Sequence, residues 1–233
     1  TYAAMVAEVD HHFGRVIDHL AARGRLDDTL VILTSDHGEQ LGDHGLMHKL
    51  AWFEESYHIP LVLSWPGRTA APGRVVDLFT ENVDVVPTIC DALDLDTDVH
   101  LDGRSLMPFL GATTPADWRD AARWEWDFRD PRHGVPGRVL GLRLDQCSLA
   151  VVRSATDHYV QFSAPSDVLP PLYFDLTDDP YCLTDRSTDA SRAGGRIAAM
   201  ERMIRWRLEH TSTGFANDLC GPEGFVSAPY VRR

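Results

Sequence analysis

The sequence is poor in positive charge and has no long apolar run. Its 233 residues include 22 lysines and arginines against 35 aspartates and glutamates, a formal net charge of −13. This excess of acid argues against nucleic acid or an anionic membrane as the main partner, and no segment approaches the length needed to span a bilayer. A small anionic substrate remains compatible, because a metal and local ligands can reverse the field inside one cleft.

Cysteine is also scarce. The four cysteines are widely spaced and form no C-x-x-C pair, so we expect buried thiols rather than a cysteine metal site. Nothing in this cysteine usage requires an oxidising compartment, and we expect a cytoplasmic protein. Thr1 rather than Met comes first, within a helical pattern. We therefore expect that an N-terminal part of a longer polypeptide is missing.

The first part of the chain has an α/β pattern. Apolar residues at three- and four-residue steps from Tyr2 to Leu20 predict an amphipathic helix that stops near Gly24. Apolar runs at 29–34 and 59–64 predict two strands joined by a long polar, glycine-bearing loop. A short helix is predicted to follow residues 80–84 and to run through Leu93, with a connector at 101–106.

From about Trp118 the pattern changes to short strands separated by turn residues. Their spacing predicts a small antiparallel sheet, with strands at 123–128, 138–144, 148–154, 158–163 and 172–176. Apolar residues between Ile197 and Leu208 predict a helix packed on this sheet. Trp124 and Trp126 alternate with charged residues, which favours core or interface positions over a substrate-stacking platform.

These patterns predict an α/β fold with three regions. Residues 1–117 would contribute part of a mixed, mainly parallel sheet covered by helices, and would carry the site loop. Residues 118–210 would form the antiparallel sheet with its packing helix. Residues 211–233 would be an irregular tail.

A carboxylate, an imidazole and a glycine follow the first predicted strand as Asp36, His37 and Gly38. In open α/β sheets the chemistry lies beyond the carboxyl ends of the strands. A carboxylate with a neutral imidazole suits a divalent cation, and a turn at Gly38 can bring both side chains toward one point. Alternatively, Asp36 caps a turn and His37 is a surface histidine. The buried strand before the pair and the loop after it favour the metal site.

Lys49 lies in the loop that follows, where the chain could fold back over the same cleft. A lysine there supplies a compact charge for an oxyanion such as phosphate or sulfate, although most loop lysines are simply solvated. His44 is interpreted as a rim group that could contact the substrate, because Gly45 argues against a helical zinc pair with His48. Glu39 could orient His37 or face solvent.

Several blocks of the sequence resemble sulfatases of the alkaline phosphatase superfamily. The most specific is TSDHGEQLGDHG at 34–45 with Lys49 downstream. The SDHG form and WRLEHT at 206–211 are similar to the phosphonate monoester hydrolase and phosphodiesterase branch, next to the arylsulfatases. On this resemblance the chain is the C-terminal half of such an enzyme. The other matching blocks are SYHIPLV at 56–62, TENVDVVPTI at 80–89, LDGRSL at 101–106 and LYFDLTDDP at 172–180.

The resemblance implies that Asp36 and His37 bind one divalent cation, calcium or manganese or else magnesium, and that Lys49 contacts the non-bridging oxygens of the substrate. It also implies a formylglycine nucleophile, matured from the cysteine of a C-x-P-x-R motif. No such motif occurs in this sequence, which places the nucleophile outside this chain. The departure leaves Asp36, His37 and Lys49 as one wall of the implied active site.

The activity implied by the resemblance is hydrolysis of sulfate esters, or of phosphate and phosphonate esters. The expected partner is a small anionic ester, with no nucleic acid and no membrane, and the full-length enzyme is expected to be a homo-oligomer. The alternative function is a non-catalytic fragment or assembly module of the same fold.

Overall fold

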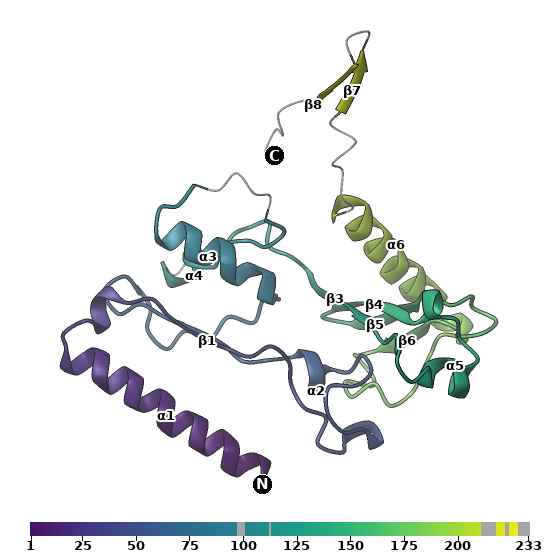
Figure 1. Ribbon diagram of the computed structural model, residues 1–233, viewed down its shortest axis with the longest axis horizontal. Coiled ribbons are helices and arrows are strands. Elements are labelled where there is room, and N and C mark those ends of the chain that lie inside the picture. The colour runs from purple at the N-terminus through teal and green to yellow at the C-terminus, as the bar shows by residue number, and fades with distance from the viewer. Residues whose placement is uncertain (97–100, 112, 211–217, 222–223, 228–233) are drawn as a thin grey trace.

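A computed structural model of the chain describes residues 1–96, 101–111, 113–210, 218–221 and 224–227. Helices and strands alternate in the first part of the chain and an antiparallel sheet follows (Figure 1). The predicted α/β class is confirmed. Within the described residues, no helix is both long and apolar enough to cross a membrane.

The helix α1 (Tyr2–Ala22) confirms the predicted amphipathic helix. It runs along the outside of the molecule, purple in Figure 1, and buries none of its own residues. Its apolar face is therefore open to solvent in this chain, through the exposed side chains of Tyr2, Met5, Val6, Val9 and Val16.

The strands β1 (Val31–Thr34) and β2 (Leu61–Ser64) form a two-stranded antiparallel pair, with Thr34 opposite Leu61. The prediction of a mainly parallel sheet is wrong for these two strands. Parallel neighbours need a crossover, usually a helix of several turns. The connection here holds only the single turns η2 (Asp43–Gly45) and α2 (Glu54–Tyr57), so the chain returns antiparallel.

The second half contains the predicted antiparallel sheet. Its strands β3 (Ala121–Asp127), β4 (Ser148–Ser154), β5 (Asp157–Phe162) and β6 (Leu172–Asp175) lie in sequence order. The helix α6 (Ala193–His210) lies on one face (Figure 1). A core forms between them from Ala121, Ala150, Val152, Tyr159, Tyr173, Ala199 and Met203.

The opposite face of this sheet holds a second core of Leu149, Val151, Val160 and Phe162. Trp124 and Trp126 pack against it, which confirms their prediction as core residues. Trp52, from the loop between β1 and β2, packs on the same cluster and lies edge-on to Phe162. The sheet is thus the surface on which that loop rests.

The predicted strand at 138–144 is wrong. The chain there forms the helix α5 (Val135–Leu140) and the turn η4 (Leu144–Gln146). Pro136 in the first turn presets a helical φ, and Gly134 and Gly141, with φ of 61° and 69°, bound the helix on either side. These start and stop signals outweigh the apolar alternation that predicted a strand.

The predicted tail is irregular only in part. The strands β7 (Asp218–Gly221) and β8 (Gly224–Ser227) pair as a hairpin that stands apart from the rest of the chain in Figure 1. The other tail positions, 211–217, 222–223 and 228–233, lie outside the described residues.

A buried carboxylate anchors the middle of the chain. Asp84 ends the turn η3 (Asn82–Asp84), which leads into the predicted helix α3 (Val85–Ala92), with α4 (Met107–Leu110) beyond. Its carboxylate is fully buried and accepts two hydrogen bonds from the Arg119 guanidinium, at 2.5 and 2.6 Å. It also accepts the backbone N–H groups of Glu81 and Arg104 at 2.9 and 2.8 Å. This network ties η3 to the segment that enters β3.

The structure describes the side chains of three of the four cysteines, and two of these are buried as the sequence predicts. Cys147 and Cys182 are buried free thiols and Cys90 is a half-buried one. Burial raises the pKa of the Cys182 thiol to about 12, so this group stays protonated and packs as a small apolar side chain.

His158 of β5 is fully buried between Trp124 and Phe174, and both ring nitrogens lack a hydrogen-bond partner in the described chain. Burial, helped by the positive charge of Arg153, lowers its pKa to about 3. The unfolded chain takes up this proton near pH 6.5 and the folded chain only near pH 3. His158 therefore costs stability as the pH falls through that window.

We expect the unfolding free energy of the complete protein to fall by about 1.4 kcal/mol per pH unit below pH 6 through this residue. His158→Phe should flatten the slope by close to one proton between pH 6 and 4, as measured by denaturant titrations at several pH values. His133→Phe is the control, because that histidine is exposed. An unchanged slope in His158→Phe would contradict this account.

Candidate active site

Asp36 and His37 stand immediately beyond the end of β1, where the sequence predicts a metal site. The Nε2 atom of His37 lies 3.5 Å from an Asp36 carboxylate oxygen. The Asp36 side chain is 85% exposed and that of His37 34% exposed, so both are open to a ligand from solvent. The structure thus brings the two predicted ligands together.

The Nδ1 atom of His37 lies 2.7 Å from the carbonyl oxygen of Gly38. Because a carbonyl can only accept, this contact places the ring proton on Nδ1 and leaves Nε2 with a free lone pair. A backbone carbonyl on the far nitrogen is the usual support for a metal-binding histidine. Gly38, rather than Glu39, is therefore the residue that orients His37.

The pair fits a divalent cation. Two ligands held about 2.1 to 2.4 Å from one ion at roughly a right angle lie about 3 to 3.4 Å apart, close to the observed 3.5 Å. The donor set, one carboxylate oxygen and one imidazole nitrogen, is hard to intermediate in character. Within the described residues no group of three histidine, cysteine or acidic side chains gathers around a metal position. Among the described residues, Asp36 and His37 are thus the two predicted ligands, with no third such side chain beside them.

The loop after His37 is closed on itself at both ends. The N–H of Gly38 donates to the carbonyl of Ser56 at 2.8 Å, and a Cβ on Gly38 would lie 2.0 Å from the carbonyl oxygen of Glu55. Only glycine allows this approach. The start of α2 is thereby held against the turn that carries the two predicted ligands.

Gln40 fastens the centre of the loop. It is fully buried, and its side-chain amide donates to the hydroxyl of Ser56 at 2.9 Å and to the carbonyl of Leu50 at 3.3 Å. Its backbone N–H donates to the carbonyl of His48 at 3.0 Å. Gln40 thus holds the residues on both sides of Lys49, which fixes the path of the main chain there.

Backbone strain is concentrated in the same loop. Left-handed φ values outside glycine are uncommon and cluster at functional segments. Here four such residues fall within eleven positions, alongside two glycines: Leu41, Gly42, His44, Gly45, His48 and Ala51. The hydrogen bonds of Gln40 and Ser56 hold the chain in this conformation.

Lys49 is exposed, and no hydrogen bond or ion pair in the described part of the chain joins it to Asp36 or His37. It is the single lysine of the sequence; the other residues in the count of 22 lysines and arginines are arginines. Two left-handed residues, His48 and Ala51, flank its position. The structure places Lys49 on the strained loop that follows Asp36 and His37, and its contact with a substrate stays a prediction.

His44 is held within the loop. Its ring stacks on Phe53 with 3.5 Å between the ring centres, and its Nε2 atom lies 3.6 Å from a Glu55 carboxylate oxygen. Glu39, which the sequence left between orienting His37 and facing solvent, accepts the backbone N–H of His48 at 2.5 Å. Both side chains stabilise the loop, and a role for His44 in binding substrate stays a prediction.

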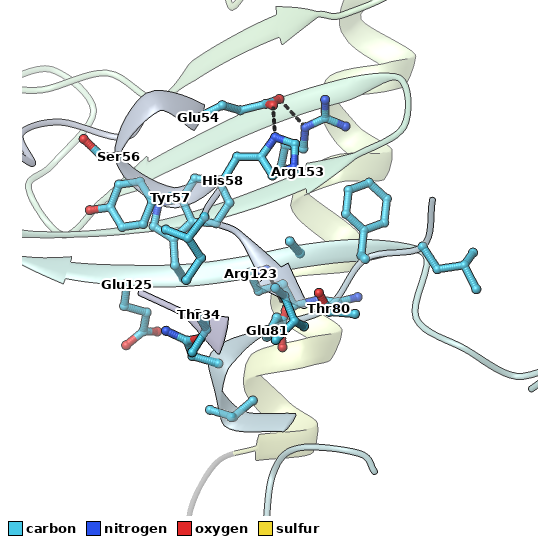
Figure 2. A pocket seen from close by; sticks show the side chains of 18 of the residues that line it. Thr34, Glu54, Ser56, Tyr57, His58, Thr80, Glu81, Arg123, Glu125 and Arg153 are labelled. Atoms are coloured by element: carbon cyan, nitrogen blue, oxygen red, sulfur yellow. Dashed lines mark hydrogen bonds and ion pairs between the residues drawn. The ribbon is translucent and has the colours of Figure 1, made fainter. Parts of the chain in front are cut away.

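A cleft of about 1150 Å³ lies beside Asp36, between the end of β1, α2, residues 75–83 and β3. Figure 2 shows Glu54 at its upper end, reaching both His58 and Arg153. The Arg153 Nε lies 2.5 Å from one Glu54 oxygen, and the His58 Nδ1 lies 3.4 Å from the other. The residues that line the cleft thus combine paired charges with aromatic rings.

Tyr57 and Glu81 line this cleft as well. Burial raises the pKa of Tyr57 to about 12 and that of Glu81 above its usual range. The Tyr57 phenol, which donates to the carbonyl of Ala51 and stacks on Trp124, therefore stays protonated at neutral pH. It serves as a fixed wall of the cleft.

Sequence reasoning missed four residues at this cleft: Glu54, His58, Asn82 and Arg153. Glu54 and His58 are four positions apart around the single turn α2, a spacing that brings side chains together on a helix. Asn82 stands in the TENVD block, which was noted only for its resemblance. Arg153 has no local signal, because its partner lies 99 positions away.

Comparison with known proteins shows the family of the chain. The Sulfatase family model matches residues 1–95, the stretch that contains Asp36, His37 and Lys49. Over 227 residues, 97% of the chain, the sequence is 39% identical to the "Multifunctional alkaline phosphatase superfamily protein PehA" of Trinickia caryophylli. The chain belongs to the sulfatase family.

The chain also resembles solved structures of relatives. It superposes over its whole length on the phosphonate monoester hydrolase of Agrobacterium radiobacter, with a TM-score of 0.88 and 44% identity. It is also 33% identical, over 71% of its length, to the N-acetylglucosamine-6-O-sulfatase of Bacteroides thetaiotaomicron. The sulfatase chain spans less than half of each relative: 43% of PehA, 44% of the hydrolase and 30% of the sulfatase.

Proposed function

We propose that this chain supplies one wall of the active site of a metal-dependent hydrolase that cleaves phosphonate, phosphate or sulfate esters. The observation that carries the proposal is the ligand pair at the end of β1, with Asp36 and the free Nε2 of His37 at 3.5 Å. The 44% identity to a phosphonate monoester hydrolase favours phosphonate monoesters among the three ester classes.

Asp36 and His37 would hold one divalent cation, which when bound would neutralise negative charge that develops on the ester oxygens. The carboxylate suits calcium, magnesium or manganese, and the imidazole favours manganese over calcium. Because this chain offers only two ligands, the remaining ligands would come from elsewhere in the complete protein. Sulfatases generally use a formylglycine nucleophile, and it too would come from outside this sequence.

Lys49 would bind the substrate through its ammonium group. A compact, freely rotating charge suits a tetrahedral oxyanion, which presents oxygens in several directions. Gln40 hydrogen-bonds to the main chain on both sides of Lys49, so the backbone position from which the Lys49 side chain extends is fixed. The ammonium would attract the non-bridging oxygens of the ester and stabilise their charge as the bond to the leaving group breaks.

The proposal is tested on the complete protein that contains this chain. Hydrolysis of 4-nitrophenyl phenylphosphonate, bis(4-nitrophenyl) phosphate and 4-nitrophenyl sulfate is compared before and after removal of metal with a chelator. We expect turnover of at least one ester, its loss on chelation, and its return with Mn²⁺, Ca²⁺ or Mg²⁺. A folded, metal-loaded protein that cleaves none of the three would contradict the proposal. So would full activity in protein shown by elemental analysis to be free of metal.

A further inference from the structure

The main chain loses its strand partner just before the ligand pair. The ladder between β1 and β2 ends where Thr34 faces Leu61. Ser35 is the next residue, and its carbonyl directly precedes the backbone nitrogen of Asp36. Since buried and half-buried carbonyls are normally paired, the orientation of this peptide depends on what replaces the lost strand contact.

Asn82 replaces it. The side-chain amide of Asn82 donates to the carbonyl of Ser35 at 3.0 Å, and its amide oxygen accepts the hydroxyl of Thr34 at 3.3 Å. One side chain therefore hydrogen-bonds to both the last residue of the strand and the first residue beyond it. Asn82 and Ser35 are 47 positions apart in the sequence, so this contact depends on the tertiary fold.

Asn82 is itself held on a rigid base. It begins the turn η3, in which Glu81 and Asp84 cap each other's backbone. Asp84 is buried against Arg119, and a Cβ on Gly103 would lie 2.0 Å from the carbonyl oxygen of Val83, so the 101–106 connector packs tightly on the turn. Several independent contacts thus hold the turn in place, and Asn82 extends from it to the end of β1.

We infer that Asn82 is a positioning residue for the cation ligands: by fixing the Ser35 peptide, it sets where the Asp36 carboxylate stands relative to the His37 ring. The inference deepens the proposed function and rests on it. His37 is oriented by Gly38 from the other side. Asn82 and Gly38 thus contact the two sides of the Asp36–His37 pair. Arg119, which precedes β3, binds Asp84 in the turn that carries Asn82, and so links the antiparallel sheet to the predicted site.

The test measures affinity for Mn²⁺ on the complete, metal-stripped protein by equilibrium competition with a chromogenic chelator. Asn82→Ala should raise the Kd for Mn²⁺ about tenfold, the lower end of the effect of residues that support metal ligands. Thr34→Val removes the Thr34 hydroxyl, which lies 3.3 Å from the Asn82 amide oxygen and 3.4 Å from the Ser35 carbonyl oxygen, and should raise the Kd about threefold. The double variant should bind no more than twofold more weakly than Asn82→Ala, because the two residues share one contact.

The control is Val83→Ala, a neighbouring side chain of the same turn that is 48% exposed. Its Kd should stay within twofold of the unmodified protein. Thermal unfolding without metal should place Asn82→Ala within a few degrees of this control, which separates loss of positioning from loss of fold. If Asn82→Ala does not fold, Thr34→Val alone carries the test.

The outcomes are distinct. Wild-type affinity in Asn82→Ala, or in Thr34→Val where that variant carries the test, would overturn the inference while the metal site stands. If the unmodified protein binds Mn²⁺ no better than Asp36→Ala does, the proposed function itself fails, and the inference falls with it. A raised Kd in Asn82→Ala alone, against an unchanged Val83→Ala, supports the positioning role.

Discussion

Replacing Asp36 by alanine should lower kcat/KM of the complete protein by at least about a hundredfold. A metal ion contributes several kcal/mol of charge stabilisation in such reactions, and each 1.4 kcal/mol corresponds to a factor of ten in rate. Asp36 is one of the two proposed ligands, and its side chain is open to solvent rather than engaged in the core. The variant should therefore keep its fold and lose its metal.

The measurement combines kinetics on the best ester substrate with elemental analysis of the purified variant. Asp43→Ala is the matched control, since Asp43 is an exposed aspartate of the same loop. It should retain both metal and rate within about threefold, as surface substitutions have small effects. Undiminished activity and metal content in Asp36→Ala would exclude Asp36 as a ligand.

Replacing Asp84 by alanine should lower the free energy of unfolding by about 3–5 kcal/mol, the usual cost of removing one partner of a buried ion pair. The variant would leave the Arg119 side chain, which is 7% exposed, with only the Glu81 carboxylate, 3.5 Å away, as a partner. It would also leave two backbone N–H groups, those of Glu81 and Arg104, without an acceptor. Most of the lost free energy of unfolding therefore comes from buried donors that no longer have their acceptor, rather than from the lost attraction between Asp84 and Arg119.

Chemical unfolding of the complete, metal-free protein measures this effect. Asp77→Ala, at an exposed position ahead of the same turn, should change the unfolding free energy by less than about 0.5 kcal/mol. Adding Arg119→Met to Asp84→Ala should recover part of the loss, because the stranded charge is then gone. A stable Asp84→Ala variant would show that the buried pair does not anchor the turn.

The ligand pair was predictable because its signal is local. Asp36 and His37 are neighbours, they follow an apolar run directly, and a glycine turns the chain after them. What orients them was harder to predict. The carbonyl of Gly38 is a main-chain group that every residue has, so the sequence does not predict its hydrogen bond to His37.

Long-range contacts account for the rest of what was missed. Asn82 meets Ser35 across 47 positions, and Arg153 meets Glu54 across 99. The antiparallel pairing of β1 with β2 was missed for a similar reason, because alternation in one strand does not state the direction of its neighbour. At residues 135–141 the sequence does contain the helix signal, because a proline and the flanking glycines mark the ends of α5. The apolar residues between them fit a strand as well as a helix, which led to the wrong prediction.

The presence of one lysine on the strained loop has a practical consequence for protein chemistry. An amine-selective ester finds a single side-chain target along this stretch of polypeptide, and that target is Lys49. Within this chain, a fluorophore or a photo-crosslinker can therefore be attached to the strained loop without mutagenesis, and the modified peptide is identified by mass. Protection of this one amine by a bound oxyanion would be read directly from the extent of labelling.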